Sequence, residues 1–214
     1  MLAGVIIASK VDDALKIMER YPLQLYEIRV DAMEELSNFQ QLERYREKLI
    51  ITVRRHQEGG LREIGERERL RIFEEFLEIE PRYMDVEFHA PIKDELLKLA
   101  KRKDVDVILS YHNFQGTPSI EELIKLAEKM RGGAVRKIVP FARSYEDNLR
   151  LLRLYEHSDG DIIAFCMGKM GKISRVLSSF LAPFTYVSLS DATAAQGILT
   201  LDEMRRILEV LGNG

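Results

Sequence analysis

Eight short, apolar, β-branched runs alternate with eight helix-period stretches along the 214 residues, and this alternation constrains the fold more than any other feature. The runs predict strands at 2–8, 25–31, 49–54, 83–88, 106–112, 136–142, 162–168 and 184–189. The intervening stretches predict helices near 11–20, 38–48, 65–79, 91–102, 119–130, 144–157, 173–181 and 200–211. Such alternation is typical of parallel strands joined by right-handed crossovers.

Eight strand–helix units predict a closed (β/α)8 barrel, the TIM barrel. A doubly wound open sheet is the alternative architecture. No linker rich in Pro, Gly or Ser and no clear repeat divides the sequence, so we expect a single domain over residues 1–214. Ser119 and Thr200 each precede an acidic first turn, which is a typical helix start.

Composition argues against several classes of function. The chain has 32 basic and 35 acidic residues, so neither a nucleic-acid nor an anionic-membrane partner is expected. The lone Cys166 precludes an internal disulfide and is expected to be a small buried hydrophobe in a reducing compartment. No apolar run reaches the roughly 18 residues of a membrane span, and the first residues lack a signal peptide's basic region. We therefore expect a cytoplasmic protein.

A lysine lies inside one of the predicted strands. Lys137 belongs to the apolar run 136–142, where burial of an unpartnered ammonium would disfavour its charged form. A desolvated, partly neutral lysine is the nucleophile that an imine-forming enzyme requires. Its plausible partners near other strands are Glu27, Arg29, Arg54, Glu58 and His112.

Polar side chains occupy alternate positions near the ends of several predicted strands. The sets that share a face are Glu27 with Arg29 and Asp31, Thr52 with Arg54, Asp85 with Glu87 and His89, and Ser110 with His112. Alternate residues point into a closed barrel, and the active sites of such barrels lie at the carboxyl ends of the strands. One such residue alone is usually structural, but convergence at one rim predicts a site.

A metal site is the competing interpretation of one of these sets. Asp85, Glu87 and His89 resemble hard metal ligands. The other histidines are scattered, and neither His-x-His nor His-Glu-x-x-His occurs, so no metal is expected. Without a dinucleotide fingerprint or a Walker loop, no nucleotide cofactor is expected either. His56 and His157 are expected at the surface.

Five motif-like segments follow one another along the chain: Glu-Ile-Arg-Val-Asp at 27–31, Arg-Arg-His-Gln-Glu-Gly-Gly at 54–60, Ser-Tyr-His-Asn-Phe at 110–114, Lys-Ile-Val at 137–139 and Met-Gly-Lys-Met-Gly-Lys-Ile-Ser-Arg at 167–175. Together and in this order they resemble the motifs of the type I 3-dehydroquinate dehydratases, the imine-forming enzymes of the shikimate pathway. The resemblance covers almost the whole chain. Two features depart from it: 194–197 reads Ala-Ala-Gln-Gly where the family usually has Ala-Pro-Gly-Gln, and Tyr186 stands near a usual phenylalanine.

This resemblance implies loss of water from 3-dehydroquinate to give 3-dehydroshikimate. Lys137 would form an imine with the ring ketone, His112 would transfer protons, and Glu58 would orient His112. Further implied substrate contacts are Glu27, Arg29, Arg54, Met167, Arg175, Tyr186, Thr193 and Gln196, with Arg175 on the carboxylate. The resemblance also implies a homodimer.

Other functions remain as alternatives. A barrel aldolase acting on a sugar phosphate would also use an imine, and Lys169 and Lys172 could serve its phosphate site. That interpretation leaves the pair of Glu58 and His112 unexplained. An inactive small-molecule binding barrel and a metal-dependent barrel are the remaining alternatives.

Overall fold

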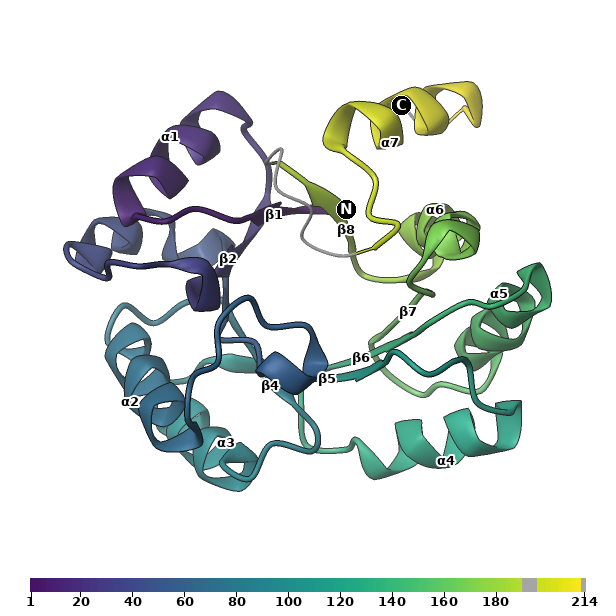
Figure 1. Cartoon of the computed structure of the whole chain (residues 1–214), viewed down its shortest axis with the longest axis horizontal. Helices are drawn as coiled ribbons and strands as arrows, with labels where there is room; N and C mark the ends of the chain where they lie inside the picture. The colour runs from purple at the N-terminus through teal and green to yellow at the C-terminus, as the bar shows by residue number, and fades with distance from the viewer. Residues whose placement is uncertain (190–195, 213–214) are drawn as a thin grey trace.

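The computed structural model describes residues 1–189 and 196–212 of the chain, and it shows a ring of parallel strands surrounded by helices (Figure 1). The strands are hydrogen-bonded in the order β7-β6-β5-β4-β3-β2-β1-β8. This sequential order confirms the predicted (β/α)8 barrel and excludes the doubly wound sheet, whose strand order reverses.

The strands agree with the predicted runs, although most end earlier. They are β1 Leu2–Ile6, β2 Leu25–Arg29, β3 Leu49–Thr52, β4 Tyr83–Glu87, β5 Asp106–Asn113, β6 Val135–Pro140, β7 Ile162–Ala164 and β8 Thr185–Ser188. Within the described residues no ladder joins β7 to β8, so the barrel is nearly closed with one seam. The seam lies beside β7, which has 3 residues and is the shortest strand.

The predicted helices are present on the outside of the ring. The α-helices are α1 Val11–Arg20, α2 Glu66–Leu77, α3 Lys93–Arg102, α4 Ile120–Lys129, α5 Tyr145–Leu152, α6 Lys172–Leu181 and α7 Leu201–Val210. The 3-10 helices are η1 Val30–Ala32, η2 Phe39–Lys48, η3 His56–Glu58, η4 Arg153–Glu156 and η5 Lys169–Gly171. Ser119 and Thr200 form the capping boxes of α4 and α7.

The segment predicted as a helix over 38–48 forms the 3-10 helix η2. Leu42 is the one fully buried residue of this segment. Helices in proteins gain most of their stability from packing an apolar face, so a segment with a single buried position gains little from a regular α-helix. Its charged residues instead cover the outer surface of the barrel beside α1.

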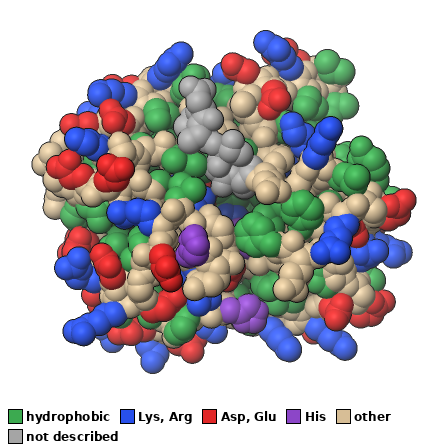
Figure 2. Space-filling view, viewed as in Figure 1, with side chains coloured by type: hydrophobic (Ala, Val, Ile, Leu, Met, Phe, Trp, Pro, Cys, Tyr) green, Lys and Arg blue, Asp and Glu red, His purple; other side chains and the backbone are tan. Residues whose placement is uncertain are grey.

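The interior of the barrel changes from apolar to polar along the strands. An apolar cluster fills the amino-terminal part and includes Ala3, Leu25, Ile50, Ile108, Val135 and Ile163. The next inward positions of the central strands are Glu27, Thr52, Asp85, Ser110 and Lys137, all buried. The register aligns Ser110 with Lys137 across β5 and β6, so the strands deliver these groups to one level. The fold therefore places buried charges beneath the carboxyl-terminal rim, which is hollowed in Figure 2.

The helices that surround the ring are short. Among the helices of residues 1–189 and 196–212, none is both long enough and apolar enough to span a membrane.

Candidate active site

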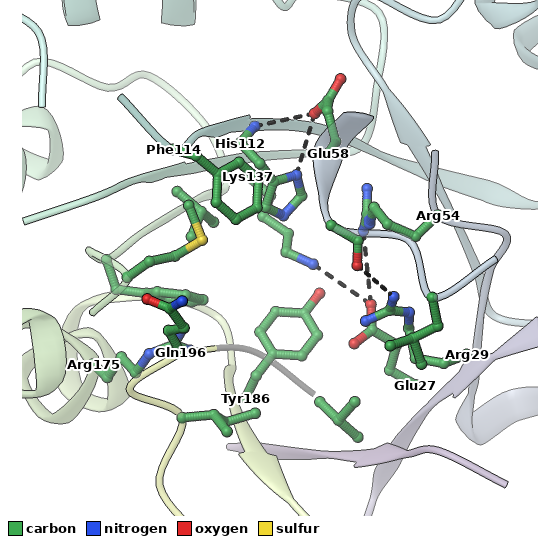
Figure 3. A pocket seen from close by; sticks show the side chains of 17 residues that line it. Glu27, Arg29, Arg54, Glu58, His112, Phe114, Lys137, Arg175, Tyr186 and Gln196 are labelled. Atoms are coloured by element: carbon green, nitrogen blue, oxygen red, sulfur yellow. Dashed lines mark hydrogen bonds and ion pairs between the residues drawn. The ribbon is translucent and has the colours of Figure 1, made fainter. Parts of the chain in front are cut away.

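A cavity of about 370 Å³ opens at the carboxyl ends of the strands (Figure 3). The residues that the sequence nominated and that line this cavity are Glu27, Arg29, Arg54, Glu58, His112, Lys137, Met167, Arg175, Tyr186 and Gln196. Thr193 lies outside the described residues. The structure thus brings residues from six strands or their following loops into one cavity.

Lys137 lies at the centre of this cavity and is 5% exposed. Its Nζ is 2.8 Å from Asp85 Oδ2, 3.5 Å from Glu27 Oε1 and 4.1 Å from the ring centroid of Tyr186. The lysine is therefore buried as predicted, and Glu27, one of its predicted partners, is within ion-pair distance. Its nearest partner is Asp85, which the sequence pattern indicated as a candidate metal ligand and not as a partner of the lysine.

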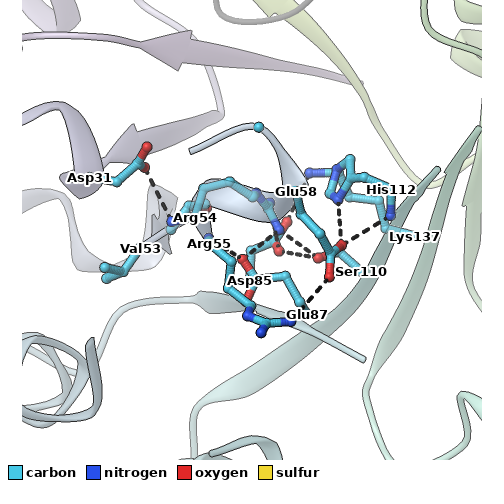
Figure 4. A network of polar contacts seen from close by, with 12 residues as sticks. Asp31, Val53, Arg54, Arg55, Glu58, Asp85, Glu87, Ser110, His112 and Lys137 are labelled. Carbon is cyan, nitrogen blue, oxygen red and sulfur yellow. Dashed lines mark hydrogen bonds and ion pairs between the residues drawn. The ribbon is translucent and has the colours of Figure 1, made fainter. Parts of the chain in front are cut away.

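Asp85 is shared between two cations (Figure 4). Arg54 Nη2 is 2.8 Å from Asp85 Oδ1, and the Ser110 hydroxyl donates to the same oxygen at 2.6 Å. Burial alone would raise the pKa of Asp85, but Arg54 and Lys137 outweigh it and hold that pKa well below its usual range. Asp85 is therefore an ionised carboxylate whose charge is divided between a guanidinium and the amine.

Arg54 continues this network toward the outer helices. Its Nη1 is 3.2 Å from Glu87 Oε1 and donates to Ser110 at 2.7 Å. The other oxygen of Glu87 pairs with Arg69 of α2. Arg69 is 0% exposed, and its guanidinium also donates a hydrogen bond to the Val53 carbonyl. Sequence patterns did not point to Arg69, because an arginine in an amphipathic helix usually lies on the solvent face.

Glu58 and His112 form the second polar pair of the cavity. Glu58 Oε2 accepts from the His112 backbone N–H at 3.1 Å and lies 3.3 Å from His112 Nδ1. Burial raises the pKa of Glu58 to about 7. Burial also lowers the pKa of His112, and Arg54 and Lys137 lower it further. The imidazole is therefore neutral near pH 7, and an ionised Glu58 favours the tautomer protonated on Nδ1, in which Nε2 can accept a proton.

Arg29 has a positioning role that the sequence did not predict. Its guanidinium donates two hydrogen bonds of 2.8 Å to Asp31 and a third, of 3.0 Å, to the carbonyl of Gly59. Asp31 also accepts from the backbone N–H groups of Arg54 and Leu61. Asp31 and Arg29 thereby fasten the end of β2 to the loop that carries Glu58.

Arg175 enters the opposite side of the cavity from α6. It is 2% exposed, its guanidinium lies 4.1 Å over the ring of Phe165, and its Nε has no hydrogen-bond partner within the described part of the chain. Burial lowers its pKa to about 10. A buried guanidinium with an unused donor is suited to an anionic group such as a carboxylate.

The remaining nominated residues complete the wall. The backbone carbonyl of Gln196 accepts from Gly168 N–H at 3.0 Å, which joins the last loop to the loop after β7. Cavity residues that the sequence did not nominate are Val5, Gly59, Leu61, Phe114, Val139, Phe165 and Ile198. Most are apolar residues in strands or loops, where the sequence pattern does not separate a cavity wall from a packed core.

The metal alternative loses its ligand set. Asp85 and Glu87 are committed to ion pairs with arginines, and His89 is exposed. Among the residues that the structure describes, no group of three or more His, Cys, Asp or Glu side chains could hold a metal ion. His56 and His157 are exposed and Cys166 is buried, which confirms those three expectations.

The fold and the cavity define a (β/α)8-barrel protein whose site presents a primary amine, a neutral imidazole and a buried guanidinium. The family model of the type I 3-dehydroquinases matches residues 4–214. The 3-dehydroquinate dehydratase of Pyrococcus abyssi is 48% identical over 216 residues, with 100% of both chains covered. The chain belongs to the type I 3-dehydroquinase family.

Solved structures agree with this assignment. The 3-dehydroquinate dehydratase of Aquifex aeolicus is 29% identical, with a TM-score of 0.78 and 98% of each chain covered. The type I enzyme of Clostridium difficile, solved with covalently modified comenic acid, is 25% identical with a TM-score of 0.83. That comparison covers 98% of this chain and 91% of the other.

The raised pKa of Glu58 predicts how stability varies with pH. The folded protein holds the Glu58 proton up to about pH 7, whereas an unperturbed glutamate carboxyl has a pKa of 4.5. The contribution of the protonated Glu58 carboxyl to the free energy of unfolding is therefore complete below pH 4.5 and is lost as pH rises through 7. In urea unfolding, the free energy of unfolding of the wild-type protein relative to Glu58→Gln should fall by up to roughly 3 kcal/mol across this range.

Glu121, in the first turn of α4, provides the control for this experiment. Hydrogen bonds at the helix start lower its pKa, so the wild-type protein measured relative to Glu121→Gln should show no such loss as pH rises. A wild-type stability that stays constant or rises relative to Glu58→Gln would contradict the prediction.

Proposed function

We propose that this chain dehydrates 3-dehydroquinate to 3-dehydroshikimate in the shikimate pathway, with Lys137 as the imine-forming nucleophile. Family membership supports the reaction. The observation that carries the residue roles is the placement of the Lys137 amine in one cavity with His112 and Arg175. An aldolase acting on a sugar phosphate has no comparable support, because the family match favours the dehydratase.

The proposed chemistry begins at the amine. Lys137 Nζ attacks the ring ketone, and loss of water gives an iminium that withdraws electrons from the adjacent C–H bond. His112, neutral near pH 7, takes that proton and then returns a proton to the departing hydroxyl group. Glu58 holds the imidazole in the tautomer that this transfer needs. Asp85 contacts Arg54 as well as Lys137, so its negative charge is not devoted to the lysine.

Substrate binding follows from the charges around the amine. Arg175 would pair with the substrate carboxylate, and Glu27, Arg29 and Arg54 would contact or order the ring hydroxyls on the other side. Met167, Tyr186 and Gln196 would form the wall between them, with Thr193 as a further contact. No metal or cofactor takes part in this proposal.

The proposal also covers the domain organisation, the cellular location and the oligomeric state. Residues 1–214 would form one catalytic domain, the protein would act in the cytoplasm, and it would assemble as a homodimer. The free, buried Cys166 is compatible with a reducing compartment.

The surface of α6 supports the dimer. Its inward face carries the buried polar residues Ser174, Arg175 and Ser178. Its outward face exposes apolar side chains, and their exposed fractions are 51% for Ile173, 38% for Leu177, 45% for Phe180 and 53% for Leu181. Leu149 of the neighbouring α5 is 67% exposed, and hydrophobic side chains gather over this region in Figure 2. A second copy of the chain would remove this apolar surface from water.

Borohydride trapping tests the proposed nucleophile. Reduction in the presence of 3-dehydroquinate should add the mass of the reduced ligand to the peptide that contains Lys137, because borohydride converts an imine into a stable amine. The exposed Lys169 should remain unmodified and serves as the internal control. An adduct that persists in Lys137→Met, or no adduct in the active wild-type enzyme, would disprove the assignment.

Arg175→Gln tests the proposed carboxylate contact. Loss of charged hydrogen bonds should raise KM about 10- to 100-fold, with a smaller change in kcat, since such bonds contribute roughly 1.5–3 kcal/mol. Steady-state assays following the conjugated product would measure both constants. Arg131→Gln, on the exposed surface, is the control. An unchanged KM would place the carboxylate elsewhere.

Leu177→Glu tests the dimer. A carboxylate at the centre of the apolar face should shift the protein from dimer to monomer in size-exclusion chromatography with light scattering. Val210→Glu, at an 86% exposed position of α7, should leave the mass unchanged. A monomeric wild-type protein at micromolar concentration would refute the homodimer.

A further inference from the structure

Tyr186 has a buried hydroxyl that the fold does not use. The side chain is 2% exposed, and its hydroxyl has no hydrogen-bond partner in the part of the chain that the structure describes. Leaving such a group unsatisfied destabilises the folded state. Figure 3 shows the hydroxyl directed into the cavity beside Lys137.

The ring of Tyr186 is explained by packing, whereas its hydroxyl is not. The ring centroid lies 5.7 Å from that of Phe184 and 6.1 Å from that of Phe165, in edge-to-face contacts that fix its orientation. Its face lies 4.1 Å from Lys137 Nζ. A phenylalanine would provide all of these contacts, so the hydroxyl requires another explanation.

Two other tyrosine hydroxyls of this protein are fully satisfied. Tyr155 donates to the Ala164 carbonyl at 3.1 Å and accepts from its N–H at 2.9 Å. Tyr26 accepts from Leu23 N–H at 2.6 Å and donates to the Tyr21 carbonyl at 3.0 Å. The unmet hydroxyl of Tyr186 therefore stands apart from them, and it lies where a ligand would bind.

We propose that the Tyr186 hydroxyl is a catalytic hydrogen-bond donor to the ketone oxygen of the substrate while Lys137 attacks the ketone carbon. This inference rests on the proposed function. The carbon that bonds to Nζ must lie close to the Tyr186 ring, and its oxygen then comes within reach of the hydroxyl. Within the described residues no group satisfies that hydroxyl before the substrate arrives.

The step balances without any further proton source. The Lys137 ammonium first gives one proton to a carboxylate beside it, Asp85 at 2.8 Å or Glu27 at 3.5 Å, which frees the lone pair of Nζ. As the bond between Nζ and the carbon forms, the π electron pair of the carbonyl moves onto oxygen, where Tyr186 donates its hydrogen bond. The proton held by the carboxylate and a second proton from Nζ then pass to that oxygen, and the C–O bond breaks while the nitrogen lone pair forms the C=N bond. The Lys137 ammonium starts with three protons, the iminium keeps one, and the departing water takes two.

Tyr186 stays neutral throughout this step. Burial raises its pKa well above the usual value, and the nearby carboxylates of Glu27 and Asp85 add to the effect. The hydroxyl therefore retains its proton and acts by donating a hydrogen bond to the charge that develops on oxygen.

Tyr186→Phe removes this donor and leaves the ring in place. The rate of imine formation can be measured by rapid mixing with 3-dehydroquinate and quenching in borohydride. In this variant it should fall about 10- to 100-fold, near the lower end of the loss that removal of an oxyanion hydrogen-bond donor causes. A primary isotope effect from deuterium at the carbon that loses its proton should decrease, because imine formation becomes rate-limiting. The melting temperature of the free enzyme should stay constant or rise, since an unsatisfied hydroxyl is removed.

Tyr155→Phe is the matched control. It removes a hydroxyl with two partners outside the cavity, so its melting temperature should fall while the rate of imine formation stays at the wild-type value. The two variants should thus change stability and rate in opposite patterns, which a purely structural role of Tyr186 would not produce.

The outcomes separate this inference from the proposed function. An imine-formation rate in Tyr186→Phe within twofold of wild type would overturn the role of the hydroxyl and leave the imine at Lys137 intact. A fall in melting temperature equal to that of Tyr155→Phe would also overturn it, since the hydroxyl would then have a structural partner. Failure of the wild-type enzyme to trap any adduct at Lys137 would overturn the proposed function itself.

Discussion

The buried ion pair between Lys137 and Asp85 is the interaction on which the site depends. Their 2.8 Å contact lies at the level where the barrel interior changes from apolar to polar. Two charges at such depth are stable only if further partners satisfy them, because desolvation costs several kcal/mol per ion. Arg54 and Ser110 supply those partners to Asp85. The amine is thus held in place by a carboxylate that is itself shared, which fixes its position without a dedicated counter-ion.

The same principle extends outward from the amine to the helices. Arg54 reaches Glu87, and Glu87 reaches Arg69 on α2, so a line of alternating charges crosses the wall of the barrel. Asp31 and Arg29 provide a second connection, from β2 to the loop of Glu58. Each group in these lines is buried and paired, and loss of one member would leave a neighbouring charge uncompensated. The catalytic rim is therefore positioned by ionic contacts as much as by the strand ladder.

The sequence predicted the barrel well, because the alternation of strand and helix periods is a local property. It also predicted that polar strand-end residues converge, since alternate positions must point inward once the sheet closes, although His89 of those sets is exposed. It could not predict which acid pairs with which base: Asp85 proved to be the partner of Lys137, and Arg69 was hidden in a charged helix. Those pairings join residues 52 and 18 positions apart, and their choice depends on register and depth. The 3-10 geometry of η2 was missed because periodicity does not measure how much of a face is buried.

Both sides of helix α6 contribute to the proposed function. Its inner side holds a guanidinium against the cavity, and its outer side presents the leucines and aromatic ring that we assign to a second copy. Barrel helices normally have a solvent side on which substitutions are nearly neutral. In the proposed homodimer that freedom is reduced, so α6 should tolerate fewer amino-acid changes over evolutionary time than α2, whose outward face is charged. Among related proteins, the sequence of α6 should accordingly vary less than the sequences of the neighbouring helices.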